Sequence, residues 1–236
     1  MSLSIVIPCH NEEASIEAVV RGLSLAAARQ DPDFEILVID DGSVDGTPAI
    51  LEAIGRRMPE LRVLRNERNL GHGRSIRRGY ETAQKEKVFQ TDSDGQFDPE
   101  ELEHLLREFP GNDIVLGFRR HRKDPLIRNG ISGLLSLLIL GIFGKRVRDA
   151  NCPFRLMRRV SLVNLLKLIP PDSSIPNILI VAGALYKGYK VRQIPVTHFS
   201  RTTGQVSLRG GRLLKLCFQS VAALIEFRRT LHGCPR

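Results

Sequence analysis

The sequence predicts an α/β fold in which an open, mostly parallel β-sheet is covered by helices on both faces. The chain has 236 residues, of which 42% are hydrophobic, which is enough for one sizeable core. In residues 1–118, short apolar runs typical of buried strands alternate with segments whose apolar residues repeat at the period of a helix. The turns between them are short, as expected for a parallel sheet with helical crossovers.

The first half of the chain supplies five predicted strands, at residues 3–8, 34–39, 63–64, 88–91 and 113–117. Helices are predicted between them, around residues 16–27, 47–54, 74–83 and 102–109. Thr47 should be the N-cap of the second helix, with Pro48 at its first position. Residues 98–101 should open the fourth helix as a capping box.

The second half loses this alternation. Residues 131–143 are almost uninterruptedly apolar but fall short of the roughly 20 residues that cross a bilayer, so this segment is either a core helix or a helix lying in a membrane interface. A second apolar segment, a strand, a flexible loop and a final helix are expected at 175–186, 191–199, 204–211 and 212–229. We therefore expect one domain at 1–205, with halves at 1–118 and 119–205, and a C-terminal amphipathic helix within 206–236.

Charge divides the chain into two unlike halves. Residues 1–118 contain 13 Lys and Arg and 22 Asp and Glu, a net charge of −9, whereas residues 119–236 contain 22 basic and 4 acidic residues, a net charge of +18. A basic half of this size favours a polyanionic neighbour, either nucleic acid or an anionic membrane surface. Nucleic acid is disfavoured because aromatic residues are few, Trp is absent and the second-half helices are apolar.

The four cysteines are scattered, without a CxxC pair or a zinc-ligand spacing, and so indicate neither a disulfide framework nor a zinc site. A reducing, cytoplasmic compartment fits this pattern. The N-terminal residues lack a basic region ahead of their short apolar run, so they do not predict a signal peptide.

Polar clusters follow four of the predicted strands, at residues 8–12, 40–43, 92–96 and 117–119. Each cluster alone has the composition of an ordinary turn. Ligands of parallel sheets bind beyond the carboxyl ends of the strands, where these four clusters would meet. Together they predict a ligand site at one edge of the sheet.

The cluster at 92–96 predicts a metal site. Asp92 and Asp94 follow a strand at alternate positions and should point the same way, and Gln96 can reach the same place after Gly95 relaxes the backbone. Hard oxygen ligands suit Mg²⁺ or Mn²⁺, which keep open positions for water and substrate phosphates. The stretch is therefore interpreted as a metal–diphosphate site.

In combination, PCHNE at 8–12, IDDGS at 39–43 and DSDGQ at 92–96 resemble the family 2 glycosyltransferases of the GT-A fold. The resemblance covers residues 3 to about 120, and is closest to the transferases that act on dolichyl or other polyprenyl phosphates. It implies that the diphosphate and the metal bind at Asp92, Asp94 and Gln96. It also implies a site for the nucleotide base and ribose at Pro8, Glu12, Asp40 and Asp41, with His10 where relatives often have a Tyr.

The second half extends the resemblance more loosely. Three arginine motifs hold the acceptor phosphate in those transferases, and the matching positions here are Arg119, Arg128 with Ser132, and Arg201. The family's D-x-x-S-G-F-[RK] stretch appears at 149–155, beginning at Asp149, with Cys-Pro in place of Ser-Gly. That departure leaves open which acceptor contacts this segment makes.

The implied reaction is an inverting transfer of a sugar from a nucleoside-diphosphate sugar to a polyprenyl phosphate. A lipid monophosphate has a second pKa near ~6, so at neutral pH it is mostly a dianion that needs no general base. Arg119, Arg128 and Arg201 would hold it, because guanidinium groups match phosphate geometry. A hydroxyl acceptor would instead require a base, for which Asp149 is the candidate.

Expected partners are thus a sugar nucleotide, a lipid phosphate and the anionic cytoplasmic face of a membrane, with a separate membrane subunit left open. One alternative is a family 2 transferase that acts on a hydroxyl acceptor in polysaccharide or glycolipid synthesis. Another is a non-catalytic scaffold that keeps the nucleotide-sugar fold within a membrane complex, although the intact Asp92, Asp94 and Gln96 argue against it.

Overall fold

A computed structural model describes residues 2–119, 126–200 and 211–232, without the side chains of residues 126–132, 134, 211–219 and 232. Its strands are β1 (Leu3–Cys9), β2 (Phe34–Asp40), β3 (Leu61–Arg65), β4 (Lys87–Gln90), β5 (Ile114–Arg119), β6 (Arg155–Arg158) and β7 (Val191–Val196). Its helices are α1 (Ile16–Gln30), α2 (Thr47–Gly55), α3 (His72–Thr82), α4 (Glu101–Glu108), α5 (Leu126–Phe143), α6 (Arg159–Leu166), α7 (Pro176–Tyr186) and α8 (Gly211–His232).

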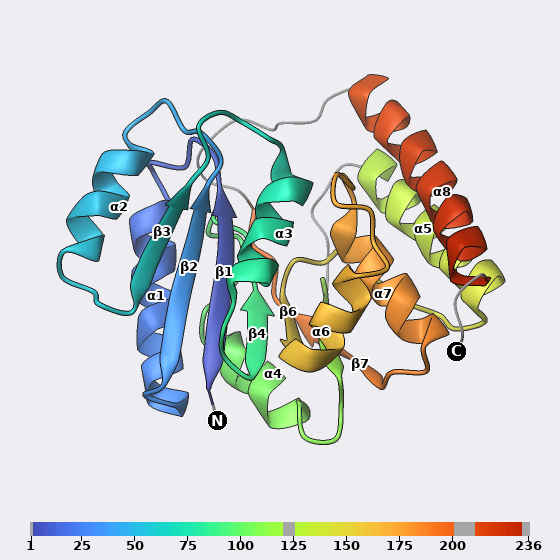
Figure 1. Cartoon of the computed structure of the whole chain (residues 1–236), viewed down its shortest axis with the longest axis horizontal. Coiled ribbons are helices and arrows are strands. Elements are labelled where there is room, and N and C mark those ends of the chain that lie inside the picture. Colours follow the sequence, from blue (N-terminus) through green and yellow to red (C-terminus); the bar gives the residue numbers. More distant parts are fainter. Residues whose placement is uncertain (1, 120–125, 201–210, 233–236) are drawn as a thin grey trace.

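The strands of this described part form one sheet in the order β3-β2-β1-β4-β6-β5-β7. β6 runs antiparallel to both of its neighbours, and the other neighbouring pairs are parallel. Helices cover both faces, with α1 and α4 together on one side and α3, α6 and α7 on the other (Figure 1). The predicted α/β class is confirmed, and the carboxyl ends of β1, β2, β4 and β5 meet at one edge of the sheet.

The sequence did not reveal β6 and α6. β6 is only four residues long, RLMR, and α6 follows it without a turn, so neither displays enough of a period to be recognised. The second half therefore completes the sheet that the first half begins, because β6 pairs with β4 on one side and with β5 on the other.

Two predictions about helix starts were wrong. Gly46, and not Thr47, is the N-cap of α2, because the Thr47 hydroxyl instead accepts a hydrogen bond from the Glu12 backbone N–H at 2.9 Å. The start of α4 has no side-chain cap, because Asp98 Oδ1 accepts the N–H of Glu100 at 3.0 Å in a local turn.

The long apolar helices differ in their surroundings. α7 is buried along nearly its whole length. α5 buries Leu135 and Ile139 but leaves Leu137 66% exposed, so it has a core-facing side and an exposed apolar side. α8 lies beside α5 in Figure 1, and three of its residues, Leu224, Phe227 and Leu231, join the core. Among the helices of the described residues, none combines the length and the apolar character needed to span a bilayer.

Gly79 allows α3 to lie close against β1 and β2. A Cβ atom at this position would overlap Val6 Cγ1 and lie 3.1 Å from Ile39 Cδ1. Gly79→Ala is therefore expected to lower the free energy of unfolding by about 1–3 kcal/mol, the usual cost of overpacking. Gly55→Ala is the matched control, because no atom lies within 4 Å of that Cβ, and its stability should be unchanged or slightly higher. Urea midpoints measure both, and equal midpoints would contradict this packing.

Candidate active site

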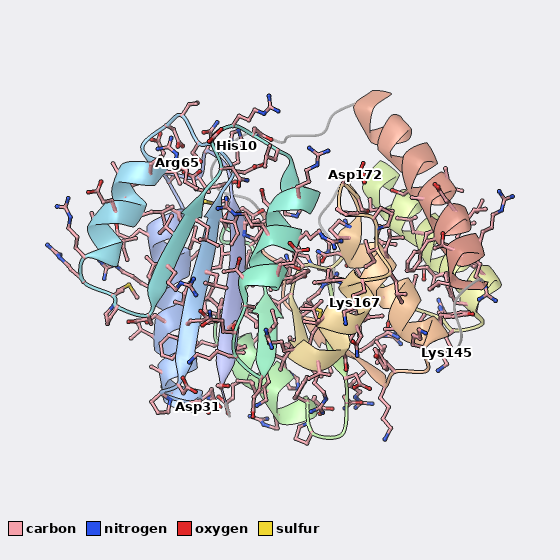
Figure 2. The ribbon with its side chains drawn as sticks, in the orientation of Figure 1. His10, Asp31, Arg65, Lys145, Lys167 and Asp172 are labelled. Carbon is pink, nitrogen blue, oxygen red and sulfur yellow. The ribbon has the colours of Figure 1, made fainter. Side chains whose placement is uncertain are left out.

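The predicted site residues of the first half gather at the carboxyl edge of the sheet. β1 and β2 are paired in register up to Cys9 and Asp40, so the loops that follow them start side by side. In Figure 2, His10 and Arg65 lie together at this end of the strands, whereas Asp31 lies at the opposite end. This placement agrees with the rule that ligands bind beyond the carboxyl ends of parallel strands.

Asp41 organises the neighbouring loop. Its carboxylate accepts hydrogen bonds from Asn66 Nδ2 at 2.7 Å and from the N–H groups of Leu70 and Gly71, both at 2.9 Å. Burial alone would raise the pKa of Asp41, but these hydrogen bonds outweigh it and leave the pKa below its ordinary value. Asp41 therefore stays ionised and holds residues 66–71 in place.

Asp40 has a different environment. It is 1% exposed, and its Oδ1 accepts the Ser43 N–H at 2.9 Å. Its Oδ2 is buried without a hydrogen bond from the described residues, although Arg65 Nε lies 3.4 Å away in an ion pair. Because buried polar atoms nearly always find a hydrogen-bond partner, this oxygen is suited to an N–H or O–H group of a ligand.

The loop after β1 is hydrogen-bonded to the loop after β2. The Asn11 N–H donates to Ser43 Oγ at 2.9 Å, and the Val44 N–H donates to Asn11 Oδ1 at 2.9 Å. Asn11 is the described non-glycine residue with a positive φ, of 55°, in the left-handed region that Asn tolerates. Pro8 lies near the end of β1 and is buried. His10 and Glu12 lie in the loop that follows, and His10 is exposed.

Ser15 connects this region to the predicted metal turn. Its hydroxyl donates to the Ser93 carbonyl at 2.8 Å and lies 3.1 Å from Glu12 Oε2. Glu12 and the turn at 92–96 are thus brought together, as the sequence predicted for parts of one ligand site.

The turn carries the three predicted donors, Asp92, Asp94 and Gln96. Gly95 has a φ of 70°, and the Gln96 N–H donates to Asp94 Oδ1 at 3.2 Å. Gln96 Nε2 donates to the Phe199 carbonyl at 2.8 Å, which leaves the amide oxygen as the acceptor that a metal would use. Two carboxylates and one amide oxygen are hard donors of the kind that Mg²⁺ and Mn²⁺ prefer, so this set fits the predicted ion.

No cluster of three or more His, Cys, Asp and Glu residues placed to hold a metal exists in the described ranges. The predicted set of Asp92, Asp94 and Gln96 contains only two residues of those types. An ion here would take its remaining ligands from substrate phosphates and water, which is the usual arrangement for Mg²⁺.

His72 is a neighbour of the site that the sequence did not identify. Its Nε2 lies 3.7 Å from Asp92 Oδ1, at the start of α3. A lone His in a loop carries no motif that would mark it as part of a site. The only available signal was the glycine on each side of it, which allows the helix start to come close to other backbone.

Arg119 and Asp149 form a buried pair on the other side of the site. Arg119 Nε lies 2.7 Å from Asp149 Oδ2, and Arg119 Nη2 lies 3.1 Å from Asp149 Oδ1. The side chains are only 13% and 6% exposed. This two-point geometry fixes the guanidinium plane, so Asp149 is placed to orient Arg119.

Arg128 and Ser132 lie in α5, one turn apart, and their side chains are outside the described residues, as is the whole of Arg201.

Comparisons with known proteins agree with this architecture. Residues 4–166 match the family model for glycosyl transferase family 2. An undecaprenyl-phosphate 4-deoxy-4-formamido-L-arabinose transferase of Pseudomonas fluorescens (strain Pf0-1) is 31% identical over 225 residues, which are 94% of this chain and 64% of the relative. The transferase of the same name from Salmonella choleraesuis is 30% identical, with 94% and 67% covered. The chain thus spans about two thirds of the length of these relatives.

Solved structures share the fold at low sequence identity. Glucosyl-3-phosphoglycerate synthase from Mycobacterium tuberculosis, solved with Mn²⁺, uridine diphosphate and phosphoglyceric acid, has a TM-score of 0.71 at 20% identity, covering 100% of this chain and 80% of that one. A mannosyltransferase from Pyrobaculum calidifontis, solved with GDP-mannose and Mn²⁺, has a TM-score of 0.67 at 16% identity, covering 99% and 65%. The family model matches most of this chain, and the sheet is GT-A-like. The chain therefore belongs to glycosyl transferase family 2.

Proposed function

We propose that this chain transfers a sugar from a nucleoside-diphosphate sugar to a polyprenyl phosphate, with inversion at the anomeric carbon. The observation that carries the proposal is the meeting, at one sheet edge, of three features: a buried Asp40 oxygen without a hydrogen bond from the described residues, the oxygen-rich turn at 92–96, and the Arg119–Asp149 pair. The names of the relatives, which are undecaprenyl-phosphate transferases, support the choice of acceptor.

The donor half would bind the nucleotide through the loops after β1 and β2. Asp40 Oδ2 is a buried acceptor suited to an N–H of the base, and exposed His10, which follows the register partner of Asp40, would offer a surface for the ring. Pro8, Glu12 and Asp41 complete this part, Asp41 by holding the 66–71 loop.

Asp92, Asp94 and Gln96 would hold Mg²⁺ or Mn²⁺ at the diphosphate. When bound, such an ion offsets the negative charge of the departing nucleoside diphosphate. His72, whose Nε2 lies 3.7 Å from Asp92 Oδ1, would face the diphosphate as well.

In the acceptor half, Arg119 would bind the lipid phosphate, aided by Arg128, Ser132 and Arg201. Oriented arginines bring a dianionic phosphate oxygen in line with the anomeric carbon. That oxygen forms the new bond as the bond from the same carbon to the diphosphate oxygen breaks, and the nucleoside diphosphate leaves with the electron pair. No side chain has to remove a proton, because the phosphate is already ionised at neutral pH.

Asp149 is better suited to positioning than to base catalysis. Both of its oxygens contact Arg119, and it is 5% exposed. This geometry favours a phosphate acceptor over a hydroxyl acceptor, which would need a carboxylate available to accept a proton. The scaffold alternative would need Asp40 and the donor set at 92–96 for nucleotide binding, but it would leave the oriented Arg119 without a role.

We further propose that the chain works at the cytoplasmic face of a membrane, with or without a membrane subunit. A cavity of about 440 Å³ beside α5 is lined by Gly133, Ser136, Leu137, Leu140, Arg146 and Arg148. Exposed leucines next to arginines suit a surface of anionic lipid, in agreement with the positive charge of the second half.

Acceptor choice tests the proposal. The purified chain would be incubated with UDP- and GDP-sugars, Mn²⁺, and either a polyprenyl phosphate or the corresponding polyprenol, in vesicles with or without anionic lipid. We expect a glycosylated lipid only from the phosphate, formed faster on anionic vesicles. Product from the polyprenol alone would establish the hydroxyl alternative, and nucleotide binding without any product would favour the scaffold.

A further inference from the structure

Arg155 is a fully buried arginine in β6, an interior strand of the sheet. Its side chain is 0% exposed, and it is the largest of the fully buried side chains of the described residues. The guanidinium donates from Nε to the Cys152 carbonyl at 2.9 Å, from Nη1 to the Asn177 carbonyl at 2.9 Å, and from Nη2 to the Ala150 carbonyl at 3.1 Å.

Its position in the sheet relates it to both halves of the site. In β6, Arg155 is opposite Gln90 of β4 on one side and Leu116 of β5 on the other. Two residues after Gln90 the chain reaches Asp92, and three residues after Leu116 it reaches Arg119. Arg155 therefore lies between the strands that carry the predicted donor residues and the predicted acceptor residues.

A hydrogen-bonded path leads from Arg155 to Asp92. Asn177, whose carbonyl accepts from Arg155, donates from Nδ2 to Gln90 Oε1 at 3.0 Å, and Gln90 Nε2 lies 3.5 Å from Asp92 Oδ1. The Tyr80 hydroxyl lies 3.1 Å from Gln90 Oε1 and 2.9 Å from Asn177 Oδ1, so it can donate its proton to either. Gln90, Asn177 and Tyr80 are all buried.

A shorter path leads to the acceptor side. The carbonyls of Ala150 and Cys152, which accept from Arg155, belong to the loop that begins at Asp149. Asp149 in turn orients Arg119 through two contacts. The Arg155 guanidinium thus holds the backbone of this loop directly after Asp149.

The charge of Arg155 needs a reason beyond packing. Burial lowers the pKa of its guanidinium, with Tyr80, Cys152, Asp149 and Asp92 acting in the opposite direction. Within the described ranges, no carboxylate forms an ion pair with it. A buried charge is costly, and well-packed apolar residues often give equal or greater stability. A guanidinium here provides what an apolar side chain cannot, namely donors directed both at the loop that contains Ala150 and Cys152 and at Asn177 in the first turn of α7.

We propose that Arg155 is a positioning residue that sets the spacing between the metal turn at Asp92 and the Arg119–Asp149 pair. This inference rests on the proposed function for the roles of those two groups. The coupling itself is a property of the fold, and it can be measured without any substrate.

Arg155→Lys is the main variant, because it keeps the charge but loses the fork of donors. Hydrogen exchange of the unliganded chain should rise in residues 149–154 and 90–96 together. Mn²⁺-dependent nucleotide binding, measured by calorimetry, should weaken about 10-fold, as is usual when groups that orient metal ligands are changed. Tyr80→Phe removes one hydroxyl from the path and should raise exchange at 90–96 alone.

Arg77→Met is the matched control. Arg77 also donates to backbone carbonyls, of Ile169 at 2.9 Å and Leu166 at 3.2 Å, but at the end of α6, away from the site. It should raise exchange near 166–170 and leave nucleotide binding unchanged. Faster exchange confined to 149–154 in Arg155→Lys would overturn the proposal. If the unmodified chain binds no nucleotide with Mn²⁺, the proposed function fails, and the exchange pattern alone decides the role of Arg155.

Discussion

Asp92→Asn is expected to reduce sugar transfer on the order of 1,000-fold while leaving the fold intact. Removing the charge of a metal ligand forfeits several kcal/mol of transition-state stabilisation, and each 1.36 kcal/mol corresponds to about tenfold in rate. Asp92 is partly exposed, with a side-chain accessibility of 31%, so its substitution by an isosteric amide should cost little stability. Initial rates and thermal melting of the same preparations measure the two effects.

The control for this experiment is Asp98→Asn, the same chemical change six residues later. Asp98 accepts the Glu100 N–H at 3.0 Å before α4 and is outside the predicted metal set. Its variant should keep at least about half of the activity, because only a local turn is altered. Equal losses of activity in the two variants would show that Asp92 has no special role.

Arg119→Met is expected to have the largest combined effect on stability and activity. It removes the two-point contact that Arg119 makes with the buried carboxylate of Asp149, and breaking comparable buried pairs costs about 3–5 kcal/mol. Sugar transfer should be lost as well, because the predicted phosphate contact disappears. Urea unfolding and initial rates, measured on the same variant, give both numbers.

The double variant Arg119→Met/Asp149→Leu separates the two roles. Replacing both members of the pair by apolar side chains also removes the buried carboxylate, so most of the lost stability should return. Activity should stay low, because the phosphate contact is still missing. A double variant that regains activity together with stability would mean that the pair is only part of the scaffold.

The sequence was sufficient for the first half of the fold because each element there carries a local signal. Alternating apolar runs and helical periods defined β1 to β5, and the polar clusters that follow these strands indicated the edge at which ligands bind. Motif combinations then indicated the family, which the family model confirms over residues 4–166.

Long-range pairing could not be predicted in the same way. β6 has four residues and joins the sheet only because β4 and β5 leave a place between them, which is a tertiary property. For the same reason Arg155 was taken as one letter of a family motif, whereas its partners Asn177 and Gln90 are 22 and 65 positions away in the sequence.

Side-chain partners within the site were equally hidden. Asp40 and Asp41 are adjacent and chemically identical in the sequence. Only the structure shows that the Asp41 carboxylate accepts three hydrogen bonds from residues 66–71, whereas Asp40 Oδ2 accepts none from the described residues. Asp149 was nominated as a base, and its two contacts with Arg119 point instead to an orienting role.

The most direct test is calorimetric titration of UDP and GDP into the chain with Mn²⁺, with Mg²⁺ and with EDTA. A site built from Asp92, Asp94 and Gln96 predicts nucleotide binding that requires the divalent ion and weakens at least about tenfold in Asp94→Asn. Equal affinity in EDTA, or unchanged affinity in Asp94→Asn, would contradict the central claim that these oxygens hold an ion at the diphosphate.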